Sequence, residues 1–368
     1  MGFKLIFTAL FASFITSAFS QGDLAPKYSN EFLSIGIGAG ALGKSNAVVA
    51  GVNDVTAGYW NPAGLTEVSD FLQIGAMHAE YFAGISKFDY VGLAKPINTG
   101  VGGFSFIRFA VDDIPNTTQL IDNNGNIDYD RITRFTAGDY AFLFSYAQKI
   151  QKIENLSVGG SFKIIYRHVG NFANAFGFGI DAGANYKLGN KWRFGAMVRD
   201  VTSTFNAWQY NLDSATIETF LVTGNEIPEG GLELTLPKVI LGAAFKTPIK
   251  NEFYFSSEIN FDLNTDGRRN VLIRTRPVSI DPHLGIEFGY GKFAAVRMGM
   301  GNLQWVKNAD LSESISFQPN IGLGIGFKSV NLDYAFTDIG DASVALYSHV
   351  FSLKIGLKNP PKKAPNNQ

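Results

Sequence analysis

A two-residue alternation of apolar and polar side chains, repeated many times between residues 71 and 357, constrains the fold of this chain more than any other feature. Residues 175–187 give the clearest case. One face carries Phe176, Phe178, Ile180, Ala182, Ala184 and Tyr186, and the other carries Gly177, Gly179, Asp181, Gly183, Asn185 and Lys187. Successive side chains of a β-strand point to opposite sides, so this pattern predicts strands with one apolar and one polar face. The predicted fold class is all-β.

Fourteen such strands are predicted, at residues 71–80, 87–95, 101–109, 140–150, 156–167, 175–187, 192–200, 238–245, 252–262, 282–289, 293–301, 317–327, 330–337 and 348–357. Short connections near residues 98, 154, 189, 249, 291 and 329 alternate with longer ones near 84, 125, 171, 220, 271, 308 and 342. An even number of strands of roughly ten residues, joined in this way, is typical of outer-membrane barrels. Such a barrel must close, because the bilayer offers backbone groups no hydrogen-bond partner.

We therefore predict a 14-stranded antiparallel transmembrane β-barrel over residues 71–357 in the cell outer membrane. The termini and short turns are expected in the periplasm, and the long loops outside the cell. Residues 1–20 read as a secretory signal peptide, because Lys4 precedes an uncharged apolar run that ends in Ala18-Phe19-Ser20. The alternative is an N-terminal membrane anchor, although the run is short for a spanning helix. Residues 358–368 are expected to form a polar periplasmic tail.

Composition narrows the function classes. A net charge of −1 shows no excess of basic residues of the kind that binds nucleic acid. The absence of cysteine excludes a disulfide framework and a cysteine metal cluster. The four histidines stand apart, and no Ser-His-Asp arrangement can be assigned, so we expect no enzymatic activity and no cofactor.

The segment of residues 21–70 differs from the rest because it is rich in small residues and fits neither an amphipathic helix nor an alternating strand. Residues 38–45 match the G-x-x-x-x-G-K-[ST] pattern of a phosphate-binding loop. That loop needs a parallel α/β context, which does not follow here. We instead interpret the segment as a plug, or hatch, in the barrel lumen, packed against inward-facing glycines. Asn61, Pro62, Ala63 and Gly64 lie at its exit into the first strand, where the fixed φ of proline suits a rigid kink.

A calcium site is one further possibility. Asp262, Asn264 and Asp266 begin a D-x-N-x-D-G pattern, as in calcium-binding loops. The position of the final bidentate glutamate holds Ile273, and three arginines lie nearby. A polar loop apex is the preferred interpretation, and calcium binding stays open.

Two stretches carry a family resemblance. Residues 32–36, 38–43 and 59–65 (FLSIG, GAGALG and YWNPAGL) resemble the start of the PorV/PorQ family, and residues 319–324 and 332–336 are similar to its end. This family is related to the FadL long-chain fatty acid transporters, which are 14-stranded outer-membrane barrels with an N-terminal hatch. The resemblance implies an accessory of the Bacteroidetes type IX secretion system that binds or shuttles exported cargo proteins for surface attachment. Trp208, Tyr210 and Trp305 are the expected loop contacts.

The alternative function is a FadL-like channel for hydrophobic small molecules such as long-chain fatty acids. In that case the Asn61-Pro62-Ala63-Gly64 motif would gate the lumen. The expected partners are outer-membrane lipid, secretion components with their cargo, or a hydrophobic ligand. A purely structural barrel is the third hypothesis.

Overall fold

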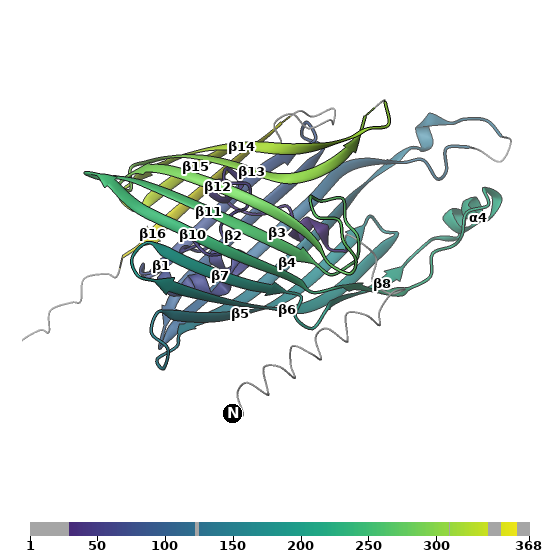
Figure 1. Cartoon of the computed structure of the whole chain (residues 1–368). Coiled ribbons are helices and arrows are strands. Elements are labelled where there is room, and N and C mark those ends of the chain that lie inside the picture. The colour runs from purple at the N-terminus through teal and green to yellow at the C-terminus, as the bar shows by residue number, and fades with distance from the viewer. Residues whose placement is uncertain (1–28, 122–124, 309, 338–346, 359–368) are drawn as a thin grey trace, which may run out of the picture.

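The computed structural model describes residues 29–121, 125–308, 310–337 and 347–358. The predicted signal peptide and nearly all of the predicted C-terminal tail lie outside this part. The described strands curl into a closed barrel with short helices inside it (Figure 1). No helix of the described residues has the length and apolar character needed to cross a membrane.

Fourteen antiparallel strands form the barrel wall, as the sequence predicts. Each pairs with the next wall strand along the chain, and β1 pairs with β16 to close the ring. Their bounds are β1 Leu72–Tyr81, β2 Ser86–Ile97, β3 Gly100–Asn116, β4 Thr133–Lys149, β5 Leu156–Val169, β6 Ala173–Leu188, β7 Trp192–Arg199, β10 Lys238–Lys250, β11 Phe253–Asn264, β12 Ser279–Tyr290, β13 Ala294–Lys307, β14 Glu313–Phe327, β15 Val330–Thr337 and β16 Ser348–Leu357.

The alternation of faces holds along these strands. On β6 the side chains of Phe176 and Phe178 are 60% and 49% exposed, whereas Asp181 on the opposite face is 3% exposed. On β11, Phe253 is exposed on the outside, while Glu258 faces the lumen and is buried. The outer face is therefore apolar, and the inner face carries the polar and small residues.

Strand ends and connection lengths depart from the prediction. The β3–β4 pair runs out to Asn116 and Thr133, and β13 runs to Lys307, well past the predicted ends. A register shift between Val111 and Ile114 on β3, and another between Gly301 and Gln304 on β13, interrupt the two-residue alternation, and the backbone ladder continues beyond them. The predicted strict alternation of short and long connections is wrong at residues 82–85, 170–172 and 308–312, which are as short as the turns.

The connection of residues 200–237 has structure that the sequence pattern did not reveal. It contains β8 (Thr204–Tyr210), α4 (Ser214–Val222) and β9 (Gly231–Thr235). β8 pairs with the first part of β6, and β9 pairs with β8, so this unit extends the sheet beyond the barrel rim (Figure 1). The N-cap of α4 is Asp213, whose carboxylate accepts a hydrogen bond from the Thr216 amide at 2.7 Å.

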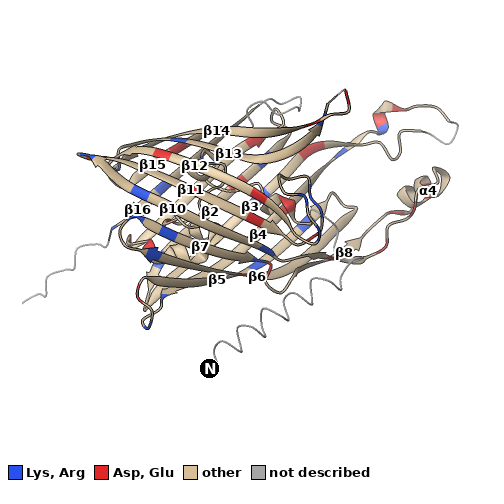
Figure 2. Ribbon diagram, viewed as in Figure 1, with Lys and Arg blue, Asp and Glu red and all other residues tan. Residues whose placement is uncertain are grey.

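We call the end that carries residues 200–237 and 265–278 the long-loop end, and the opposite end the short-turn end. Basic residues mark the short turns, where Lys191, Lys292 and Lys328 lie (Figure 2). One further helical turn, η3 (Tyr129–Arg131), belongs to the β3–β4 connection.

Candidate functional site

The N-terminal segment, residues 29–70, passes through the barrel from one end to the other. It starts at the long-loop end, where the Ser29 hydroxyl donates to Glu233 of β9 at 2.5 Å. It ends at the short-turn end, where Leu72 pairs with Leu357. Its helices are η1 (Glu31–Leu33), α2 (Ala39–Leu42), α3 (Ala57–Trp60) and η2 (Pro62–Glu67), coloured purple in Figure 1.

This path bears on the prediction that both termini lie with the short turns. Strand β16 does end there. Ser29, the first described residue, lies at the other end. The mature N-terminus itself falls outside the described residues, so the end of the barrel at which it lies stays a prediction.

Glycines on the wall are the points where the N-terminal segment comes closest. A Cβ atom added to Gly195 of β7 would lie 2.6 Å from the Val49 carbonyl oxygen and 2.7 Å from the Ala50 Cα. One added to Gly159 of β5 would lie 2.6 Å from the Pro62 carbonyl carbon. Only glycine leaves room for such backbone contacts, as the inward glycine pattern suggested.

Asn61 is the most heavily bonded residue of the predicted Asn-Pro-Ala-Gly motif. It is fully buried. Its Nδ2 donates to the Val49 carbonyl at 2.9 Å, to Asn185 Oδ1 at 2.8 Å and to the Ala184 carbonyl at 3.3 Å. Its Oδ1 accepts from the Ala63 amide at 3.2 Å and so caps η2. Asn61 therefore ties two parts of the N-terminal segment to strand β6.

The other motif residues shape the same corner. Pro62 occupies the first position of η2, where its missing N–H costs nothing. Ala63 is fully buried, and a Cβ on Gly64 would lie 2.5 Å from the Val52 carbonyl oxygen. The motif thus folds the chain back on itself just before β1.

The stretch that matches a phosphate-binding loop has a different environment. Residues 39–42 form the four-residue helix α2 against β14, β15 and β16. The Gly38 amide donates to Met77 Sδ at 2.9 Å, and the Ala39 amide donates to Ser352 Oγ at 3.0 Å. These amides bond to the barrel wall, and the described residues before them, 29–38, contain no parallel strand.

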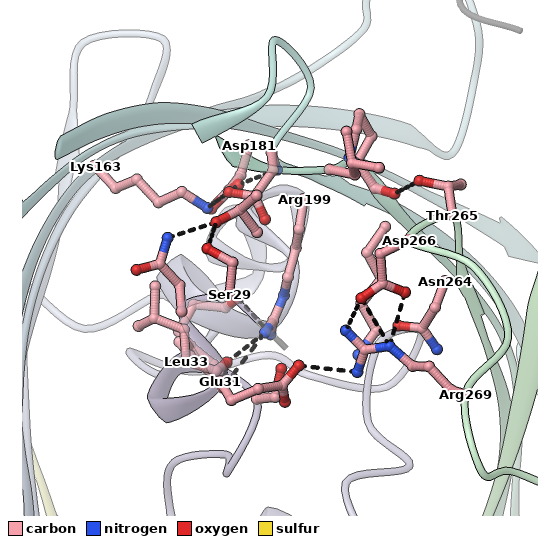
Figure 3. A pocket seen from close by; sticks show the side chains of 18 of the residues that line it. Ser29, Glu31, Leu33, Lys163, Asp181, Arg199, Asn264, Thr265, Asp266 and Arg269 are labelled. Carbon is pink, nitrogen blue, oxygen red and sulfur yellow. Dashed lines mark hydrogen bonds and ion pairs between the residues drawn. The ribbon is translucent and has the colours of Figure 1, made fainter. Parts of the chain in front are cut away.

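A polar cluster fixes the start of the N-terminal segment at the long-loop end (Figure 3). Arg199 of β7 donates to the Leu33 carbonyl at 2.8 Å. Arg269 bridges Asp266, at 2.6 Å, and Glu31 of η1, at 2.9 Å. A cavity of about 40 Å³ lies between these groups.

Lys163 of β5 lies beside this cluster and is buried. Its ammonium contacts Asp181 at 2.8 Å and Asp200 at 2.5 Å. Two carboxylates around one ammonium compensate the loss of water that burial of these charges entails. In Figure 3, Lys163 and Asp181 of this ion triad lie on the wall next to Arg199.

The calcium pattern lies close by, and its carboxylates contact cations. Lys238 lies 2.8 Å from Asp262, and Arg269 holds Asp266. Among the described residues, no three or more His, Cys, Asp or Glu side chains are grouped so as to hold a metal ion. Asp262 and Asp266 are therefore engaged in ion pairs, and calcium binding at Asp262, Asn264 and Asp266 stays open.

A second set of contacts fixes the middle of the N-terminal segment. The Glu258 carboxylate of β11 accepts from the Ala50 amide at 2.7 Å and the Gly51 amide at 2.9 Å. Asp54 pairs with Lys354 of β16 at 2.7 Å. Burial raises the pKa of Asp54, but the charge and hydrogen bond of Lys354 outweigh it and lower the pKa to about 2.

Two large cavities flank the N-terminal segment. The short-turn cavity measures about 610 Å³, and its lining contains nine Lys or Arg residues against six Asp or Glu residues. This end of the lumen therefore attracts anions. The long-loop cavity measures about 560 Å³ and is lined by polar groups that include Asn46, Asp281 and His283.

The predicted loop aromatics are mostly engaged within the chain. The Trp208 indole donates to Glu233 at 2.7 Å, and Arg167 lies 5.0 Å above its ring. Trp305 lies at the end of β13, not in a loop, and its indole donates to the Leu272 carbonyl at 3.1 Å. Tyr210, at the end of β8, is exposed.

Sequence reasoning missed the charged residues that hold the N-terminal segment, namely Arg199, Glu258 and the Asp54–Lys354 pair. The sequence did contain a signal for the charged residues on the wall. Each wall member of this set occupies an inward position, and a charge there requires a partner in the lumen.

Comparison with known proteins supports the fold only. No family model matches the chain, and no curated protein matches it in sequence. The chain is similar to the CymD monoaromatic hydrocarbon channel, with a TM-score of 0.52 at 14% identity over 88% of this chain and 98% of that one. It is also similar to the toluene transporter TodX of Pseudomonas putida, with a TM-score of 0.53 at 12% identity over 87% of this chain and 98% of that one. The toluene transporter TbuX of Ralstonia pickettii gives a TM-score of 0.50 at 11% identity over 88% and 98%.

The chain therefore has the barrel fold of the CymD channel and the TodX transporter. The sequence comparisons give the PorV/PorQ resemblance no support.

Proposed function

We propose that this protein is an outer-membrane channel for hydrophobic small molecules, and that the N-terminal segment is the plug that closes it. The observation that carries the proposal is a closed 14-stranded barrel, with the fold of hydrocarbon channels, whose lumen contains this segment between two cavities. We assign the protein no catalytic role.

The outer face of the barrel supports placement in a membrane. Large apolar side chains cover it on strands all around the ring, including Phe144, Phe162, Phe178, Leu241 and Phe288, each 44–51% exposed. A soluble protein rarely leaves so large an apolar surface in water. In a bilayer the same surface contacts lipid, as in outer-membrane barrels.

The side of the lumen formed by β1–β5 favours a hydrophobic solute. Met77, Phe88, Tyr90, Ile107 and Leu143 project inward there and are buried against the N-terminal segment. Withdrawal of the segment from this side exposes an apolar wall. A solute that covers the wall regains roughly 25 cal/mol per Å² of apolar surface.

The test is uptake by intact cells, because a hydrophobic compound crosses a simple lipid bilayer without help. We expect a strain without the gene to take up a labelled alkyl or aromatic compound more slowly, and the plasmid-borne gene to restore the rate. Equal uptake with and without the gene, for both compound classes, contradicts the proposal.

A role in type IX secretion is the second candidate, and one observation favours it. Helix α4 stands beyond the barrel rim (Figure 1), and its Leu221 and Val222 are 64% and 82% exposed. An apolar surface on a projecting loop suits a protein partner. Loss of cargo display in a deletion strain with unchanged uptake of hydrophobic compounds would favour this candidate over the channel.

A further inference from the structure

Trp60 occupies a singular position between the two cavities. Among the residues that the structure describes, it is the one that lines both the short-turn cavity and the long-loop cavity. Its side chain is 4% exposed. The rest of each lining comes from different residues of the wall and the N-terminal segment. Trp60 is therefore the point of the partition that both cavities touch.

The contacts of the ring keep it in this position. The indole Nε1 donates to the Ile37 carbonyl at 3.0 Å. Tyr59 packs edge-on at 4.8 Å between ring centroids, and the Arg199 guanidinium lies 5.7 Å from the ring. The opposite edge lies over Gly36, which has a φ of 101°, and a Cβ there would be 2.9 Å from Trp60 Cη2.

We propose that Trp60 is the gate residue of the channel, and that its side chain closes the point at which both polar chambers meet the same residue. This inference rests on the proposed function. The lining of both chambers is largely polar and charged, so their union forms a path for water and small ions. The ring is held by one hydrogen bond, by packing and by a cation–π contact, whereas Asn61 next to it is held by four hydrogen bonds.

The test is ion conductance of the purified protein in planar bilayers, which needs no hydrophobic substrate. A closed gate opens in roughly a tenth of molecules or fewer, so we expect Trp60→Ala to raise the mean conductance about tenfold or more. Trp60→Phe keeps a ring in place and is expected to conduct like the wild type. Wild-type conductance in Trp60→Ala overturns the proposal.

The matched control is Phe32→Ala. Phe32 is a similarly buried aromatic residue of the same segment, but it lines neither large cavity. Its truncation loosens the N-terminal segment without joining the chambers, so its conductance should stay near that of the wild type. If Phe32→Ala conducts as well as Trp60→Ala, general loosening explains the current and the proposal is wrong.

A second variant keeps the test valid if Trp60→Ala fails to fold. The natural chain has no cysteine, so Trp60→Cys carries a single thiol. We expect it to conduct, and expect a benzyl methanethiosulfonate, which restores an aromatic ring at this position, to return the conductance toward the wild-type value. An unchanged current after complete labelling contradicts a gate based on side-chain volume. A further outcome is that the conductances change as expected while cells with and without the gene take up hydrophobic compounds equally fast. That result would support the gate and reject the proposed substrate class.

Discussion

Replacement of Asn61 by alanine tests most severely how the N-terminal segment is held. The side chain makes four hydrogen bonds from a fully buried position. A buried hydrogen bond contributes about 1 kcal/mol net, and loss of an N-cap costs about 1 kcal/mol. The Nδ2 bonds share two hydrogens, so we count two of them with the cap. The docked state of the segment should lose about 3 kcal/mol.

A loss of this size changes the population of the undocked state by a measurable amount. At about 1.4 kcal/mol per factor of ten, the undocked population rises by roughly two orders of magnitude. Hydrogen exchange of the backbone amides of residues 47–66, followed by mass spectrometry in detergent micelles, reports this population directly. We expect Asn61→Ala to accelerate exchange in this region, while the barrel strands keep their protection, since their ladders do not involve the Asn61 side chain.

The matched control is Asn53→Ala in the same segment, because Asn53 is exposed. It should exchange like the wild type. Wild-type exchange in Asn61→Ala would refute the assignment of Asn61 as a main attachment point. Equal acceleration in Asn53→Ala would show that any change in the segment has this effect.

Three further perturbations have expected outcomes. The pKa of Asp54 is lowered to about 2, so its ion pair with Lys354 should stabilise the docked segment by about 2 kcal/mol above pH 4. This contribution should be lost as the pH falls from about 4 to 2. The protease resistance of the segment should fall over the same pH range, and Asp54→Asn should abolish this pH dependence. Gly195→Val should displace the segment, because its Cβ would meet backbone atoms at 2.6–2.7 Å, whereas Gly231→Ala, with no atom within 4 Å, should be silent in the same proteolysis assay. Lys163→Met leaves two buried carboxylates without their cation and should lower the free energy of unfolding in denaturant by about 3–5 kcal/mol. A loss below about 1 kcal/mol would contradict the burial of this triad.

The sequence predicted the wall well because its information is local. Alternation along β6 alone determines which face is apolar, and the same rule located all fourteen strands. The predicted strand ends were wrong where the ladder continues past a break in the alternation, as on β3 and β13. The β8–α4–β9 unit was missed because its short strands pair only with the end of β6 and with each other.

The site was less predictable because its contacts join residues far apart in the chain. The Asp54–Lys354 and Glu31–Arg269 pairs have no local signature. The Asn61-Pro62-Ala63-Gly64 motif was visible in the sequence, yet the partners of Asn61 on β6 required the structure. The dividing role of Trp60 follows only from the cavities.

A reversible tether of the N-terminal segment to the wall tests the central claim most directly. The Asn320 Nδ2 of β14 donates to the Ser45 hydroxyl at 2.6 Å, so cysteines at these two positions can be bridged by a short bifunctional methanethiosulfonate. The account predicts that bridging the double variant stops uptake of a hydrophobic compound by intact cells, and that a reductant restores it, while the single variants Ser45→Cys and Asn320→Cys are unaffected. Equal uptake by the bridged and reduced double variant would contradict a plug that must move for the channel to open.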